Sequence, residues 1–178
     1  MLKKPENSEY PQNRYFSYYI EQVENEDVIA ALTEQMTEVE NLIKNLKPNQ
    51  ENYRYAEGKW SIKEMLGHLT DTERIFAYRA LCIARGEKQS LPGFDENEYA
   101  NAANFAEQSL DDLLNQYHFT RLANLALFKS FTEEVASRMG NANNNAVSAR
   151  GLIWMIAGHE RHHLKILKEK YLAASFEQ

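Results

Sequence analysis

The chain has 178 residues, of which 43% are hydrophobic and 26% are charged, and its formal net charge is −6. This composition is typical of a single globular domain over residues 1–178 and excludes a wholly disordered chain. Acidic and basic residues are mixed along the sequence without a basic stripe, so we expect no nucleic-acid partner. No apolar run approaches the roughly 20 residues that span a bilayer, and the first residues lack a signal peptide, so we expect a cytoplasmic protein without a membrane partner.

Helix signals run along the whole chain, which has seven glycines, four prolines and no alternating run long enough for a sheet. The first 23 residues are polar and aromatic, and we expect them to form an N-terminal arm or a short helical turn. Apolar residues spaced three and four apart then predict a helix over residues 29–46, which Pro48 ends. Ser61 and Glu64 form a capping-box pattern that predicts a second helix, ending at about residue 85 before Gly86.

The second half of the chain is expected to contain two more long helices. After the loop EKQSLPGFDENEYA, with a short helix near residues 95–103, a third long helix is predicted over residues 109–131. A minor helix over residues 132–139 and the polar break GNANNNA follow, and Ser148 caps a last long helix that reaches about residue 172. Four long helices without a sheet predict an all-α four-helix bundle with short additional helices.

The last predicted helix carries GHERHH, in which His159, Glu160 and His163 spell HExxH. On a helical wheel of about 100° per residue both histidines fall near the middle of the apolar arc. Being four residues apart, they lie one turn from each other, so both imidazoles can reach one ion at roughly 2.0–2.1 Å. The pair therefore favours metal binding over two hydrogen-bonded core histidines, whereas His162, at the edge of the arc, is expected not to be a ligand.

HExxH is also the signature of many zinc proteases, which take a third ligand from further along the chain. Only residues 164–178 follow the motif, and Ile166 and Glu169 stand where the metzincin pattern requires glycine and histidine. Zincins also place a sheet edge beside the helix to hold a peptide, and no strands are expected here. The protein is therefore not expected to be an HExxH protease.

The third ligand can instead lie upstream of the last helix. KWS, then His68 within HLTDTER, then LPGFDENEYA, and finally HERHH occur in an order that resembles the DinB superfamily, in particular its YfiT-like metal-dependent branch, over roughly residues 25–172. The resemblance implies that His68, His159 and His163 bind one divalent ion per chain, zinc or nickel, inside a four-helix bundle. The helical wheel alone places His68 on a flank of its helix, which suits either an open site or a surface histidine.

The resemblance implies two competing chemistries. Three neutral imidazoles leave the ion's charge uncompensated, so it can activate either a bound water or a low-molecular-weight thiol. We favour thiol transfer to an electrophile, with metal-dependent hydrolysis of a small-molecule substrate as the alternative. A third reading is a non-catalytic metal-binding bundle that acts by association.

Other residues near the motifs are candidates for supporting roles. Glu160 is the candidate catalytic base, or an acceptor for a ligand N–H, because it is the one acid adjacent to a ligand. Asp71 and Glu73 are similar candidates, although a surface position is favoured for each. Arg79 could attract an anionic group of the substrate, although a solvated arginine is the default.

Three further aromatic residues bear on the site and on assembly. His118 could line the cavity or add a ligand, although a packed or interface position is favoured. Trp60 is expected to anchor the start of the second helix by packing. Trp154 faces away from the core on the last helix's wheel, and subunits in the resembled family often pair, so we expect a homodimer.

Overall fold

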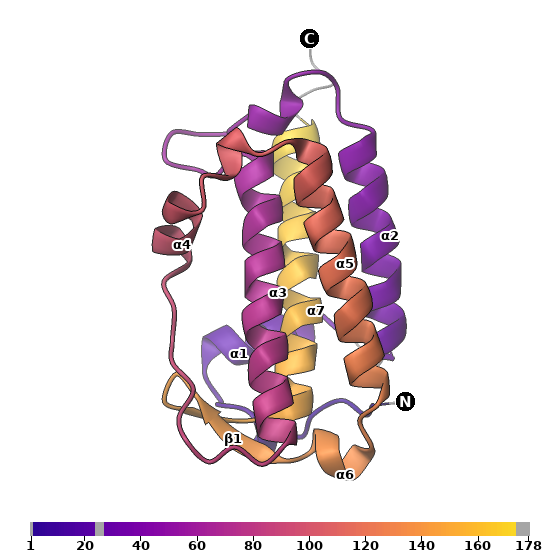
Figure 1. The fold of residues 1–178 in the computed structure, drawn as a ribbon, viewed down its shortest axis with the longest axis vertical. Coiled ribbons are helices and arrows are strands. Elements are labelled where there is room, and N and C mark those ends of the chain that lie inside the picture. The colour runs from indigo at the N-terminus through magenta and orange to yellow at the C-terminus, as the bar shows by residue number, and fades with distance from the viewer. Residues whose placement is uncertain (1, 24–26, 174–178) are drawn as a thin grey trace.

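The structure, a computed structural model, describes residues 2–23 and 27–173. Figure 1 shows an elongated bundle of four long helices, which confirms the predicted all-α architecture. These helices are α2 (Val28–Lys44), α3 (Ile62–Ala84), α5 (Leu110–Lys129) and α7 (Ala149–Ile166). None of the helices in the described ranges combines the length and the apolar character needed to cross a bilayer.

Two of the long helices begin at the residues that the sequence predicts, and shorter elements connect the long helices. Ser61 and Glu64 form a complete capping box at the start of α3, and Ser148 accepts a hydrogen bond from the amide of Gly151 at the start of α7. The short helices are η1 (Asn7–Glu9), α1 (Arg14–Glu21), η2 (Gln50–Asn52), α4 (Glu96–Ala102), η3 (Phe105–Glu107) and α6 (Glu133–Ala136). The last helix continues beyond α7 as a π-helical segment, η4 (Leu167–Leu172).

The connection between α3 and α5 determines how the bundle is wound. In Figure 1 both helices descend from the same end, so the chain returns along the side of the bundle through the segment that contains α4. Around the bundle, α3 packs against α5 and α7, and α2 packs against the same two helices. α7 also contacts α1, so it has neighbours on three sides. This enclosure explains why every residue from 149 to 160 is buried.

The polar stretch after α6 differs from the sequence prediction, which had no sheet. It forms an antiparallel hairpin of β1 (Met139–Ala142) and β2 (Asn145–Ser148). Asn143 and Asn144, with φ of 51° and 60°, make the two-residue turn, because asparagine tolerates the positive φ that such hairpins need. Leu91, in the crossover segment, exchanges backbone hydrogen bonds with Asn141 and Asn143 and so ties that segment to the hairpin.

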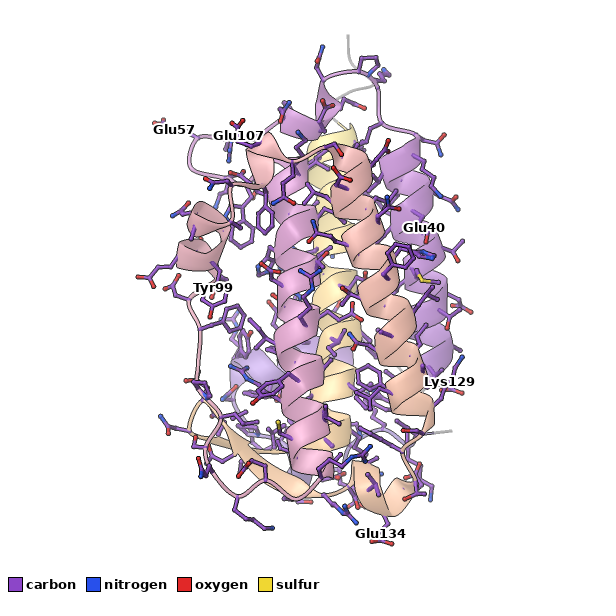
Figure 2. The ribbon with its side chains drawn as sticks, viewed as in Figure 1. Glu40, Glu57, Tyr99, Glu107, Lys129 and Glu134 are labelled. Carbon is purple, nitrogen blue, oxygen red and sulfur yellow. The ribbon has the colours of Figure 1, made fainter. Side chains whose placement is uncertain are left out.

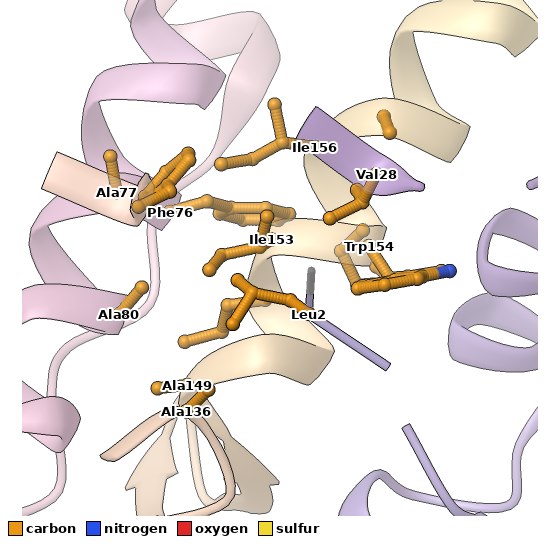
Figure 3. Packing of buried hydrophobic residues seen from close by; sticks show 14 of the residues in the cluster. Leu2, Val28, Phe76, Ala77, Ala80, Ala136, Ala149, Ile153, Trp154 and Ile156 are labelled. Carbon is orange, nitrogen blue, oxygen red and sulfur yellow. The ribbon is translucent and has the colours of Figure 1, made fainter. Parts of the chain in front are cut away.

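The N-terminal residues cover a face of α7 that the sequence analysis assigned to a partner subunit. Trp154 is fully buried, and in Figure 3 its indole lies beside Val28 at the start of α2. The inference from Trp154 was therefore wrong: the residue lies on the side of α7 away from Phe76 and Ala80 of α3, but it is buried within the core of its own chain. The expected homodimer stays a prediction without support from this residue.

The contact between α1 and α7 is unusually close at one glycine. A Cβ atom added to Gly158 would lie 1.8 Å from the backbone oxygen of Tyr19, well inside van der Waals contact. Gly158 immediately precedes His159, so the missing side chain lets α1 approach the part of α7 that carries the HExxH motif. A glycine within a helix lowers helix propensity by about 1 kcal/mol, and the close packing offsets that cost.

We predict that Gly158→Ala destabilises the protein by about 1–3 kcal/mol, because the added methyl group must displace the backbone of α1. Thermal and urea unfolding measure the change, and Ala126→Ser, at an exposed position of α5, provides a control for the addition of one heavy atom. An unchanged unfolding midpoint for Gly158→Ala would show that α1 does not pack as described.

Candidate metal centre

Three histidines from two helices converge at one point inside the bundle. His68 comes from α3, and His159 and His163 come from successive turns of α7. The Nε2 atom of His159 lies 3.0 Å from Nε2 of His68 and 3.1 Å from Nε2 of His163. One ligand atom from each residue lies within 4.8 Å of the other two, so the structure brings together the three residues expected to bind an ion.

Hydrogen bonding alone does not account for this arrangement. A neutral imidazole carries one N–H donor and one acceptor nitrogen, so the single Nε2 of His159 cannot be matched to two partners at once. Nitrogens that share a tetrahedral ion at 2.0–2.1 Å lie roughly 3.3 Å from each other, which is close to both distances. The donor set, three imidazole nitrogens around one point, therefore suits a divalent metal ion.

Burial keeps the three imidazoles neutral, as metal ligation requires. Burial lowers the pKa of His68 from 6.5 to about 4. The pKa of His159 falls well below its ordinary value through burial, and the neighbouring histidines lower it further. His163 behaves in the same way, with burial as the main cause and His68 as the next. All three lone pairs are available near pH 7.

Aromatic and hydroxyl groups hold the imidazoles in place. The indole of Trp60 lies against His68 with ring centroids 4.4 Å apart, so Trp60 touches the site in addition to packing at the start of α3. Tyr19 of α1 meets His159 edge to face at 5.4 Å. The Oγ1 atom of Thr72, one turn after His68, lies 3.5 Å from its Nδ1. The sequence signal for Trp60 was its place in KWS, just before the helix that carries His68.

The histidines open onto a cavity of about 510 Å³, a size suited to a small molecule. Its walls come from α1, α3, α7, the crossover segment and the hairpin. The aromatic lining consists of Tyr15, Phe16, Tyr19, Trp60, Phe76 and Phe94. The polar lining, apart from the histidines at positions 68, 159, 162 and 163, consists of Asn13, Thr72, Arg79, Glu96, Asn143 and Asn145.

Glu160, the candidate catalytic base, points away from this cavity. Its carboxylate accepts a hydrogen bond from the hydroxyl of Tyr117 and lies 2.6 Å from Nη2 of Arg121. The same arginine pairs with Glu73 of α3 at 2.8 Å, so Glu73 is a buried ion-pair partner and the favoured prediction of a surface position was wrong. Glu160 is absent from the cavity lining, and its contacts favour a structural role.

The remaining candidates lie outside the cluster of three. His162 lines the cavity, and its Nδ1 lies 3.0 Å from the hydroxyl of Tyr18. His118 does not line the cavity, because it pairs with Glu40 of α2. Figure 2 shows Glu40 on the opposite side of the bundle from Tyr99 of α4, whose ring packs on the cavity residue Phe94. Asp71 pairs with Arg74 on the outer face of α3.

The chain is thus a four-helix-bundle protein in which two buried histidines and one half-buried histidine, from two helices, meet beside a cavity. A profile of the DinB superfamily matches residues 20–167, so the chain belongs to this superfamily, as its motifs indicate. A protein of Oceanobacillus iheyensis named as a candidate metal-dependent hydrolase is 23% identical over 128 residues. That alignment covers 71% of this chain and 73% of the relative.

Two solved structures share the fold at low sequence identity. YfiT from Bacillus subtilis, described as a probable metal-dependent hydrolase with an unusual four-helix bundle topology, superposes with a TM-score of 0.75 at 14% identity. The match covers 98% of this chain and 94% of YfiT. A mycothiol-dependent maleylpyruvate isomerase superposes with a TM-score of 0.64 at 16% identity, over 82% of this chain and 61% of the isomerase.

We predict that the purified protein binds one divalent ion per chain and that His68→Ala, His159→Ala or His163→Ala each reduces occupancy at least tenfold, because each removes a ligand. Elemental analysis after dialysis measures the ratio. The controls are His118→Ala and His162→Ala, which keep full occupancy. Occupancy lost in a control and retained in His159→Ala would contradict the proposed ligand set.

We predict that the metal-free protein loses stability as the pH falls from 6.5 to 4. The folded chain keeps the pKa of His68 near 4, whereas an unfolded histidine titrates near 6.5, so within this window the unfolded state binds more protons. The stability that is lost in this window is fully present above pH 6.5. Thermal unfolding from pH 8 to pH 4 measures the effect, and a variant with glutamine at positions 68, 159 and 163 should show a flatter profile. An equally steep profile in that variant would assign the loss to other groups.

Proposed function

We propose that the protein is a metal-dependent enzyme that activates a low-molecular-weight thiol for transfer of its sulfur to an electrophile. The proposal is supported by the three neutral imidazoles, by the adjoining cavity and by the relatives, one of which is named as a mycothiol-dependent enzyme. Two others are named as metal-dependent hydrolases, so the names of the relatives differ in the reaction that they give. His68, His159 and His163 would hold the ion, zinc or nickel, and the enzyme would act on a small molecule in the cytoplasm.

A divalent ion on three neutral histidines would leave a position open and lower the pKa of a thiol or a water that occupies it. Trp60 and Tyr19 pack on the histidines and limit the access of bulk water to this point. The aromatic wall of the cavity would hold the rest of the thiol and the electrophile. In the transfer, the thiol gives up its proton to solvent, its sulfur forms a bond to carbon of the electrophile, and the electrophile's leaving group departs with the electron pair of the bond that breaks.

The observation that carries the preference for thiol transfer is that, in the part of the chain that the structure describes, no carboxylate from α3 or α7 lines the cavity with the histidines. Among the described residues, Glu96 is the one acid that lines the cavity, and it lies at the start of α4. Glu160 and Glu73 are both paired with Arg121 in the core. A hydrolase needs a base within about 3 Å of the attacking water, whereas thiol activation needs little beyond the ion and a pocket.

Hydrolysis remains a second candidate because His162 lines the same cavity. Its Nδ1 is engaged by the hydroxyl of Tyr18, which leaves Nε2 for proton transfer. Burial lowers the pKa of His162, so the ring is neutral near pH 7 and able to accept a proton. A hydrolytic enzyme built on this site would therefore use His162, and Glu160 would support the helices.

The two reactions are separated by assaying the metal-loaded protein with N-acetylcysteine and 1-chloro-2,4-dinitrobenzene, and with p-nitrophenyl acetate. We expect metal-dependent thiol conjugation that is abolished in His159→Ala and kept within about threefold in Glu160→Gln, because Glu160 does not reach the reacting atoms. His162→Asn should likewise leave conjugation largely unchanged.

Faster ester hydrolysis that falls a hundredfold or more in Glu160→Gln with its metal retained would restore Glu160 as the base and overturn the proposal. The same loss in His162→Asn alone would identify the hydrolase built on His162. Loss of thermal stability in the double variant His159→Ala/His163→Ala, with no metal-dependent reaction in the parent protein, would indicate a structural metal.

A further inference from the structure

Three arginines are buried in this bundle, and two of them are fully matched by carboxylates. Arg121 pairs with Glu73 and Glu160 in the core. Arg150, at the start of α7, pairs with Glu9 and Glu133. This pattern is expected, because a charge taken out of water is costly unless an opposite charge accompanies it. The third buried arginine, Arg79 of α3, does not follow the pattern.

Arg79 is only 6% exposed and has a single hydrogen bond, from Nη2 to the backbone oxygen of Pro92 at 2.6 Å. The rings of Phe76 and Phe94 lie 5.5 and 5.7 Å from its guanidinium carbon. Within residues 2–23 and 27–173 no carboxylate forms an ion pair with it. A guanidinium carries five N–H donors, and the described residues supply a hydrogen-bond acceptor to one nitrogen of Arg79.

Arg79 lines the same cavity as the three histidines. It follows His68 by eleven positions, so the two side chains leave α3 within about 20° of each other and on the order of 16 Å apart along the helix axis. Asn13, Asn143 and Asn145 also line the cavity and add polar residues to its wall. Glu96, the one acid of the lining, is exposed to water, which screens its charge.

The unmatched cation, its burial and its place in the cavity point to a ligand that supplies the missing anion. We infer that the cavity binds a molecule with a carboxylate at one end, held by Arg79, and a metal-reactive group at the other, held at the three histidines. This inference rests on the proposed function, because it assigns the anionic end of the small molecule that the metal centre acts on. A bidentate pair between the guanidinium and the carboxylate fixes the molecule's direction in the cavity.

Arg79 also fastens the crossover segment through its hydrogen bond to Pro92 and its contact with the ring of Phe94, and a purely structural role would rest on these contacts. The two roles differ in what they predict for a neutral ligand. If Arg79 only held the crossover segment in place, its loss would loosen the cavity wall and lower the affinity of every ligand alike. If Arg79 binds a carboxylate, and so forms an anion site, its loss would lower the affinity only of ligands that carry a carboxylate.

The test uses 6-mercaptohexanoic and 8-mercaptooctanoic acids together with the alcohols of the same chain length. Two chain lengths are used because the distance between the guanidinium of Arg79 and the three imidazoles depends on the direction of each side chain as well as on the separation along α3. Calorimetry measures the affinity of each probe for the cobalt-loaded protein. Ultraviolet absorption reports separately whether the sulfur has reached the metal.

We expect at least one acid to bind roughly tenfold or more tightly than its alcohol, because an ionised hydrogen-bond partner strengthens the contact. Arg79→Gln should remove this preference while leaving the alcohol's affinity unchanged, and Arg79→Lys should keep part of it. Arg74→Gln, which removes an exposed arginine from the outer face of α3, should behave like the parent protein.

Equal binding of acid and alcohol in the parent protein, a preference that survives Arg79→Gln, or an equal loss for both probes would each overturn the inference. If the alcohols show the absorption of metal-bound sulfur without any preference for the acids, thiol activation stands and the anion site fails. If the acids show an Arg79-dependent preference without that absorption, the anion site stands and thiol activation fails.

Discussion

The arrangement of the bundle depends on the contacts of one side chain, the guanidinium of Arg121 on α5. It pairs with Glu73 on α3 and Glu160 on α7, and it donates a hydrogen bond to the backbone oxygen of Leu32 on α2, so it connects all four long helices. A buried ion pair is favourable only in good geometry, and this one restricts how α3 and α7 can rotate about their axes. Glu160 directly follows His159, and Glu73 lies five residues after His68. The network that holds the helices therefore also fixes the directions of the imidazoles.

The sequence could predict the parts of the molecule that depend on local spacing. The apolar repeat, Ser61 with Glu64, and Ser148 set the positions of long helices, because periodicity and capping act within a few residues. The pairing of His159 with His163 follows from one helical turn. His68 was different: on its own helix it lies on a flank, and a flank becomes interior only when α7 is placed beside it. The resemblance to DinB proteins supplied that information, which the helical wheel could not.

The predictions that failed concern contacts between segments that lie far apart in the sequence. Trp154 faces away from α3, as the wheel indicates, but no property of the last helix reveals that α1 will cover it. Gly158 was the sequence feature that could have indicated the contact between α1 and α7, because a glycine within a helix often marks the close approach of another segment. Glu73 and Arg121 are separated by 48 positions, so their pairing is invisible to local patterns. The turn at Asn143 and Asn144 was read as a break because each strand it joins has only four residues.

The cavity is built from two parts of the chain that differ in how they relate to the superfamily. The match to the DinB profile begins at residue 20, so Tyr15, Phe16 and Tyr19 on α1 lie outside it, while all three histidines lie within it. The three histidines and this wall of the chamber are carried by different helices. A substitution at Tyr15 or Phe16 would therefore reshape the chamber while leaving all three imidazoles in place, so the space beside the histidines can be altered without redesign of the bundle.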